Sequence, residues 1–166
     1  MLEAIRDRFS CRSYTGEPVS QEDLRTVLAA GFCAPSAHNS RPWHFVVATD
    51  QEARQKLSKT HQWSRMCAQA PVVIAVCADR AKDPDWWVDD SAAAIENMLV
   101  QAQALGLGTV WIGIYAAEGR ADYVRGVLDI PQEVEVVGLV AMGYPAQSPG
   151  EREDRYDEEC VHWGKW

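Results

Sequence analysis

The sequence lacks the features that mark several large classes of protein. Its five cysteines are odd in number and show no CxxC spacing, so neither a disulfide framework nor a zinc knuckle is indicated. No stretch approaches the ~20 apolar residues of a membrane span, and the first eight residues lack the apolar run of a signal peptide. We therefore expect a cytoplasmic protein that neither spans nor binds a membrane.

Positive charge is also scarce. Sixteen basic residues against twenty-four acidic residues give a net charge of −8. This charge repels polyanions and argues against nucleic acid as a partner. Twelve of the sixteen basic residues are arginines, whose planar guanidinium binds phosphate through two hydrogen bonds. A local pocket for one small anionic cofactor is therefore compatible with the acidic total.

Common motifs of metal and nucleotide enzymes are absent as well. The chain has no P-loop, HExxH or GxSxG sequence, and its four histidines show no metal-ligand spacing. The segment GLGTVW begins like a dinucleotide-binding fingerprint, but Trp111 replaces the third glycine. This segment also follows a predicted helix and precedes a predicted strand, which reverses the order that pyrophosphate binding needs. We expect neither a metal centre nor a dinucleotide-binding fold.

The apolar pattern predicts one α+β domain over residues 1–166. A chain of this length buries roughly 68–70% of its unfolded surface. Ser20 can cap a helix, and the continuously apolar run 71–77 predicts a central strand buried on both faces. Strands and helices do not alternate regularly, which favours a mostly antiparallel sheet. Further strands are predicted at 44–48, 109–114 and 134–142, and further helices near the N-terminus, within 51–70, over 85–105 and around 120–128.

Two segments indicate contact with a second subunit. The predicted helix 85–105 is rich in alanine and has little polar surface, so we expect it to be buried against a twin. Gly106 and Gly108 are expected to end this helix in the left-handed conformation. The polar tail after Gln147 carries two tryptophans that a partner would cover.

Arg8, Ser10 and Arg12 alternate along the end of the first predicted helix. If the chain is extended there, all three side chains point to one side, because successive side chains of a strand alternate between its faces. One could hold a phosphate and another could approach a ring carbonyl. The alternative is a pair of solvated arginines beside a helix end.

The segment that contains these residues, RFSCRSY, resembles the opening motif of the nitroreductase family. The resemblance implies that Arg8 and Ser10 hold phosphate or ribityl oxygens of FMN. It also implies that Arg12 lies beside the flavin pyrimidine. Phe9 departs from the arginine or histidine that is usual at its position.

The loop 34–43, APSAHNSRPW, resembles the APSxxNxQPW motif of the same family. Arg41 stands where the family usually has glutamine, and the alternative for the loop is an ordinary turn before a strand. The likeness implies that four residues of this loop reach the flavin held mainly by the other subunit of a homodimer: Pro35, Ser36, Ala37 and Asn39.

Two later segments extend the likeness. The segment ALGLGTVWIG is similar to the family's ALGLGxxWIG, which implies that main-chain amides of Ile112 and Gly113 face the N5 and O4 edge of the flavin. The closing stretch resembles the C-terminus of the small nitroreductases, with Arg155 as the second phosphate arginine. The role of Arg152, which lies between two glutamates, is left open.

Together these segments imply a nitroreductase-like three-layer α/β/α fold whose C-terminal tail is exchanged with the partner subunit. They imply an FMN-dependent oxidoreductase with a ping-pong cycle. In this cycle NADH or NADPH reduces the flavin and leaves, and a nitroaromatic, quinone or related electron-poor compound replaces it. No catalytic side chain is expected, because the flavin carries the chemistry.

Three alternatives remain open for the function. The chain could be a reductive dehalogenase or a flavin-destroying enzyme on the same fold. It could bind or sequester flavin without turnover. It could also be a structural dimer that has lost its flavin.

Overall fold

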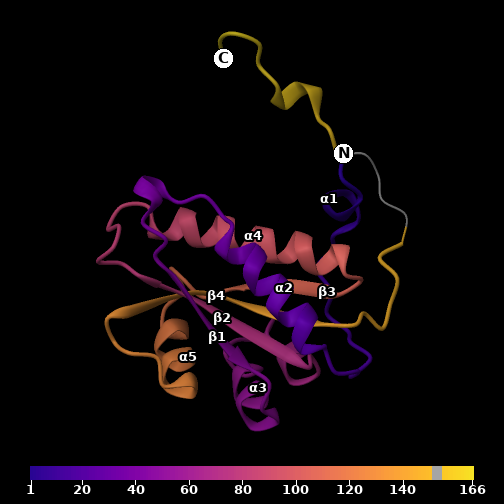
Figure 1. The fold of residues 1–166 in the computed structure, drawn as a ribbon, viewed down its shortest axis with the longest axis vertical. Coiled ribbons are helices and arrows are strands. Elements are labelled where there is room, and N and C mark those ends of the chain that lie inside the picture. Colours follow the sequence, from indigo (N-terminus) through magenta and orange to yellow (C-terminus); the bar gives the residue numbers. More distant parts are fainter. Residues whose placement is uncertain (151–154) are drawn as a thin grey trace.

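The computed structural model describes residues 1–150 and 155–166, so Arg152 lies outside the described residues. Helices cover both faces of a four-stranded antiparallel sheet, which gives three layers (Figure 1). This architecture confirms the predicted α+β class. The strands, in the spatial order β1-β2-β4-β3, are β1 (Trp43–Ala48), β2 (Val72–Asp79), β4 (Val134–Gly143) and β3 (Gly108–Gly113).

Helices α2 (Gln21–Phe32) and α4 (Trp87–Ala104) cover one face of the sheet. Helices α3 (Gln51–Leu57) and α5 (Arg120–Leu128) cover the other face. None of the helices within 1–150 and 155–166 has the length and apolar character that a membrane crossing requires. The remaining elements are α1 (Glu3–Asp7) and three 3₁₀ turns, η1 (Ala37–Asn39), η2 (Arg65–Ala68) and η3 (Glu158–Cys160).

Strand β2 connects two separate hydrophobic cores, as its apolar run predicts. Ile74 and Val76 pack on the side of α2 and α4, while Val73 and Ala75 pack on the side of α3 and α5. All four side chains are fully buried. Strand β2 therefore contributes side chains to the cores on both sides of the sheet.

Two of the three predicted helix-end signals hold in the structure. The Ser20 hydroxyl accepts a hydrogen bond from the Asp23 N–H at 2.9 Å, and α2 begins at the next residue, as predicted. Gly106 has a φ of +76° and follows the end of α4, also as predicted. The prediction for Gly108 is wrong, because this residue begins β3. Its missing side chain serves another purpose: a Cβ there would lie 2.7 Å from the Cys11 side chain.

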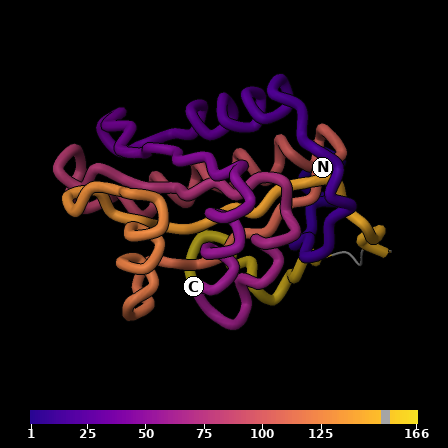
Figure 2. Tube along the Cα trace, turned by 90° about the horizontal axis from the view of Figure 1, so that it is seen from below, coloured from indigo at the N-terminus to yellow at the C-terminus, as the bar shows by residue number. Residues whose placement is uncertain are grey.

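The close approach at Gly108 brings the N-terminal segment onto the outer edge of β3. The Cys11 N–H donates to the Thr109 carbonyl at 2.8 Å, and Ser10 forms a parallel bridge with Thr109. The segment then passes the end of β4, where the Ala146 N–H donates to the Ser13 carbonyl at 3.0 Å. Figures 1 and 2 show these indigo and orange segments beside each other. The arginine-bearing segment is thus fixed to the sheet by its backbone.

We predict that Gly108→Ala lowers the free energy of unfolding by about 1–3 kcal/mol, because the new methyl group must displace Cys11 from β3. Gly126→Ala is the matched control. Gly126 lies on α5 with no atom within 4 Å of an added Cβ. Its replacement should raise the free energy of unfolding by about 0.5–1 kcal/mol. Urea denaturation measures both changes, and wild-type stability of Gly108→Ala would contradict the close approach.

Candidate functional site

A cavity of about 410 Å³ lies beside the attached N-terminal segment. Residues 9–13 line one side of it and residues 147–149 line the other. Ser10 and Arg12 both contribute to this lining, and the Arg12 Nη1 donates to the Ser10 carbonyl at 3.2 Å. The structure thus brings together a hydroxyl and a guanidinium from the predicted set. The volume is within the range of small-molecule sites.

Arg8 lies outside the lining of this cavity. Its Nε is 3.7 Å from the Glu96 Oε1 on α4, and the glutamate side chain is about half exposed. An ion pair of this kind contributes little to stability, since water competes for both groups. An anionic ligand that binds Arg8 therefore has to replace only its weak contact with the Glu96 carboxylate.

The outer edge of β3, against which the N-terminal segment lies at Thr109, presents main-chain groups along its length. The Thr109 carbonyl accepts from Cys11 on this side, and the Gly113 carbonyl accepts from the Arg120 Nη1 at 3.0 Å. Because N–H and C=O groups alternate between the two sides of an antiparallel strand, Gly113 directs its N–H to the same outer edge. Ile112 directs its own N–H toward β4, where it pairs with Leu139.

The loop before β1 has a compact and unusual backbone. His38, Asn39 and Arg41 have φ values of 54°, 54° and 48°, in the left-handed region that residues other than glycine rarely adopt. The Ser36 hydroxyl accepts from the Arg41 N–H at 3.0 Å, and the Arg41 Nε donates to the Asn39 Oδ1 at 2.9 Å. These internal bonds support a strained conformation, and such strain is concentrated at functional sites.

Two buried carboxylates near the start of α4 hold this loop. Asp90, which is 6% exposed, accepts from the Ala37 N–H at 2.9 Å and from the Ser40 hydroxyl at 3.2 Å. Asp83, which is 4% exposed, lies 3.1 Å from the His38 Nδ1, and this hydrogen bond lowers the pKa of the Asp83 carboxyl. Neither carboxylate was predicted as a site residue from the sequence, because acidic residues before and in the first turn of a helix are also typical of a solvated surface.

Within one subunit the loop and the cavity lie at opposite corners of the sheet. Thr109 lies on the same row as Val72, whereas Trp43, which follows the loop, pairs with Ala78. From the strand spacing and the rise per residue, these positions are on the order of 20 Å apart. Ser10 and Arg12 are therefore not brought together with the loop that contains Pro35, Ser36, Ala37 and Asn39.

Arg155 is also separate from the cavity lining. It begins the exposed C-terminal segment 155–166, which projects from the body of the subunit (Figure 1). Trp163 and Trp166 of this segment are 85% and 100% exposed. Such exposed indoles are unusual in a subunit that acts alone.

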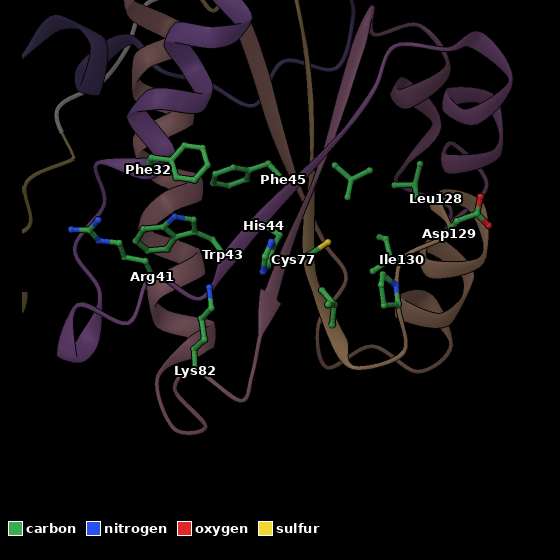
Figure 3. A pocket seen from close by; sticks show the side chains of 13 residues that line it. Phe32, Arg41, Trp43, His44, Phe45, Cys77, Lys82, Leu128, Asp129 and Ile130 are labelled. Atoms are coloured by element: carbon green, nitrogen blue, oxygen red, sulfur yellow. The ribbon is translucent and has the colours of Figure 1, made fainter.

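A larger cavity of about 830 Å³ runs along β1, the other edge strand (Figure 3). Burial raises the pKa of its Cys77 thiol to about 12, so this thiol is not a nucleophile at neutral pH. This cavity could not be predicted from the sequence, because its two sides come from distant segments. One side carries Phe32, Trp43 and Phe45, the other carries Leu128 and Ile130, and the basic side chains in the lining are Arg41, His44 and Lys82.

The chain is similar in sequence to known proteins. The sequence profile of the nitroreductase family matches residues 5–64 and 58–144. A protein of Methanothermobacter thermautotrophicus, named as an NADH dehydrogenase/NAD(P)H nitroreductase, is 40% identical over 100% of this chain and 87% of its own length. An FMN reductase [NAD(P)H] of Bacillus subtilis is 30% identical over 98% of this chain and 72% of its own length.

A solved structure shows the same fold. The FMN-dependent nitroreductase of Clostridium difficile R20291 superposes with a TM-score of 0.94 at 28% identity, with all of both chains covered. The profile match covers far more than half of the chain, and the archaeal relative covers all of it. The chain therefore belongs to the nitroreductase family.

Proposed function

We propose that this protein is a cytoplasmic, homodimeric FMN oxidoreductase that uses NAD(P)H to reduce nitroaromatic, quinone or related small electron-poor compounds. Relatives named NAD(P)H nitroreductase and FMN reductase support the NAD(P)H-dependent flavin chemistry. The observation that carries the proposal is the placement of Ser10 and Arg12 at one cavity beside the outer edge of β3. All five cysteines are free thiols, as is usual in a reducing compartment.

The residues at this edge fit a flavin mononucleotide. The cavity offers a hydroxyl and a guanidinium to an anionic, oxygen-rich ligand, and the strand edge offers an N–H donor. When bound, FMN would supply the hydride-transfer chemistry between NAD(P)H and the acceptor. No side-chain nucleophile is needed.

Each group then has a separate task. The Ser10 hydroxyl and the Arg8 guanidinium would hold phosphate or ribityl oxygens, with Arg155 as a second phosphate ligand. Arg12 would place a fixed positive charge beside the pyrimidine, where it favours negative charge. The Gly113 N–H suits the N5 edge better than the N–H of Ile112, because only Gly113 directs its amide outward.

A second subunit supplies the part of the site that one subunit cannot. The strained loop lies at the opposite corner of the sheet, so its four candidate residues would meet the flavin of the partner. An apolar groove of about 890 Å³ beside α1 and α4 offers a surface for this association. Leu2, Ile5 and Val100 line the groove, and Leu2 and Ile5 are exposed in the single subunit.

The C-terminal segment would be exchanged between the subunits. Its tryptophans need an apolar site, and the cavity along β1 offers Phe32, Trp43 and Phe45. The β1 strand is also an edge of the sheet, where another chain can add main-chain hydrogen bonds. The acidic run at 157–159 is complementary to the basic side chains Arg41, His44 and Lys82 of this cavity.

We predict that the purified protein shows a flavin absorption band that NADH or NADPH bleaches under anaerobic conditions. The band should return when a nitroaromatic or quinone is added, because one site serves both half-reactions. A visible spectrum recorded at each step measures this. A band that no reduced nicotinamide bleaches would leave a flavin-sequestering protein, and the absence of any band would contradict the proposal.

We also predict that Arg8→Ala and Arg155→Ala each weaken FMN binding by about 1.5–3 kcal/mol, since each variant removes a charged hydrogen bond to phosphate. Fluorescence titration of the apoprotein with FMN gives the dissociation constants. Arg25→Ala, which removes an exposed arginine from α2, is the matched control and should bind like wild type. Unchanged affinity in both test variants would refute the assigned phosphate site.

A further inference from the structure

The strained loop comprises residues 36–41. Within the described part of the chain, the Asp90 carboxylate is the main group that holds this loop to α4. Both oxygens of Asp90 accept hydrogen bonds from the loop, one from the Ala37 N–H and one from the Ser40 hydroxyl. These two donors flank His38 and Asn39, which have left-handed backbone conformations. The carboxylate therefore holds both ends of the left-handed segment, which would relax to a more favourable backbone conformation if it were free.

We propose that Asp90 is the positioning residue of the flavin site: it holds residues 37–40 in the conformation in which they meet the flavin of the partner subunit. This inference rests on the proposed function. It assigns a role to a residue that need not touch the cofactor. The ordering of the loop would be completed before the flavin binds, and such preorganisation increases affinity.

The burial of Asp90 indicates that its main role is to bind the loop and not to interact with solvent or the helix dipole. A buried carboxylate loses its hydration and needs compensating donors, and both side-chain hydrogen bonds that Asp90 makes come from the loop. Helix stabilisation alone does not require this burial. Asp89 lies in the same first turn of α4, is exposed, and is equally able to interact with the helix dipole.

The hydrogen bond between His38 and Asp83 is a weaker contact between the loop and the region before α4 than the bonds to Asp90. His38 reaches Asp83 through one hydrogen bond, and its side chain is 80% exposed. Solvent competes strongly for an exposed partner. The contact of His38 with Asp83 therefore contributes less to the loop conformation. Asp90 fixes the loop on both sides of His38 and Asn39.

The test compares Asp90→Ala and Asp90→Asn with Asp89→Ala as the matched control. Fluorescence titration of the full-length apoprotein with FMN should give a dissociation constant about tenfold or more above wild type for Asp90→Ala. Asparagine retains an acceptor for the Ala37 N–H, so Asp90→Asn should recover part of the affinity. Asp89→Ala should stay within about twofold of wild type, because it removes only a solvated charge at the helix start.

Amide hydrogen exchange in the absence of FMN separates positioning from a general structural role. The Ala37 amide should exchange at least about tenfold faster in Asp90→Ala, while the core amides of Ile74 and Ala75 keep their wild-type rates. Equal acceleration at all three positions, or an unchanged dissociation constant, would overturn the proposal. If Asp90→Ala does not fold, Ser40→Ala removes one of the two donors and is judged by the same two measurements. Failure of the wild type to bind FMN would instead refute the proposed function, and the exchange of Ala37 would still test the anchor.

Discussion

The hydrogen bond from the Cys11 N–H to the Thr109 carbonyl is the contact on which the candidate site depends. It holds an irregular N-terminal segment against the outer edge of β3 and so fixes where Ser10 and Arg12 lie. The contact is possible because Gly108 leaves room for the Cys11 side chain. With this attachment, the Ser10 and Arg12 side chains line one cavity beside the edge of β3. Without it, the same residues would be solvated groups beside a short helix.

Helix α4 contacts candidate residues of both halves of the site. Its Glu96 lies beside Arg8, and its Asp90 holds the strained loop, while its apolar side packs on the sheet. Of these contacts, only the one through Asp90 fixes a group of candidate residues, because Ser10 and Arg12 are fixed by β3 and the Arg8–Glu96 ion pair is weak. The sheet nevertheless keeps the two halves at opposite corners of a single subunit, so α4 cannot bring them together around one ligand. In our account two-fold symmetry removes this obstacle, because each subunit completes the site of its partner.

Much of the fold could be predicted from local patterns, and the site only in part. Ser20 signals a helix start, and the apolar run of β2 signals a central strand, because each depends on neighbouring residues alone. The family motifs predicted the candidate residues of the site, among them Ser10 and Arg12. The sequence could not show that Gly108 serves a close approach, or that Asp90 is buried, because both depend on segments distant in the chain. The cavity along β1 was missed for the same reason.

A site shared between two subunits can be tested by mixing two variants that damage different halves of it. Arg12→Glu reverses the charge at the cavity, and Ala37→Trp obstructs the loop, so each homodimer alone should fail to bind FMN. After equal amounts are unfolded and refolded together, mixed dimers should carry one intact site, which restores about one quarter of all FMN sites. Bound FMN per subunit, measured by absorbance after gel filtration, gives this fraction. Recovery near one quarter would support a site shared between subunits, and no recovery in mixed dimers would contradict it.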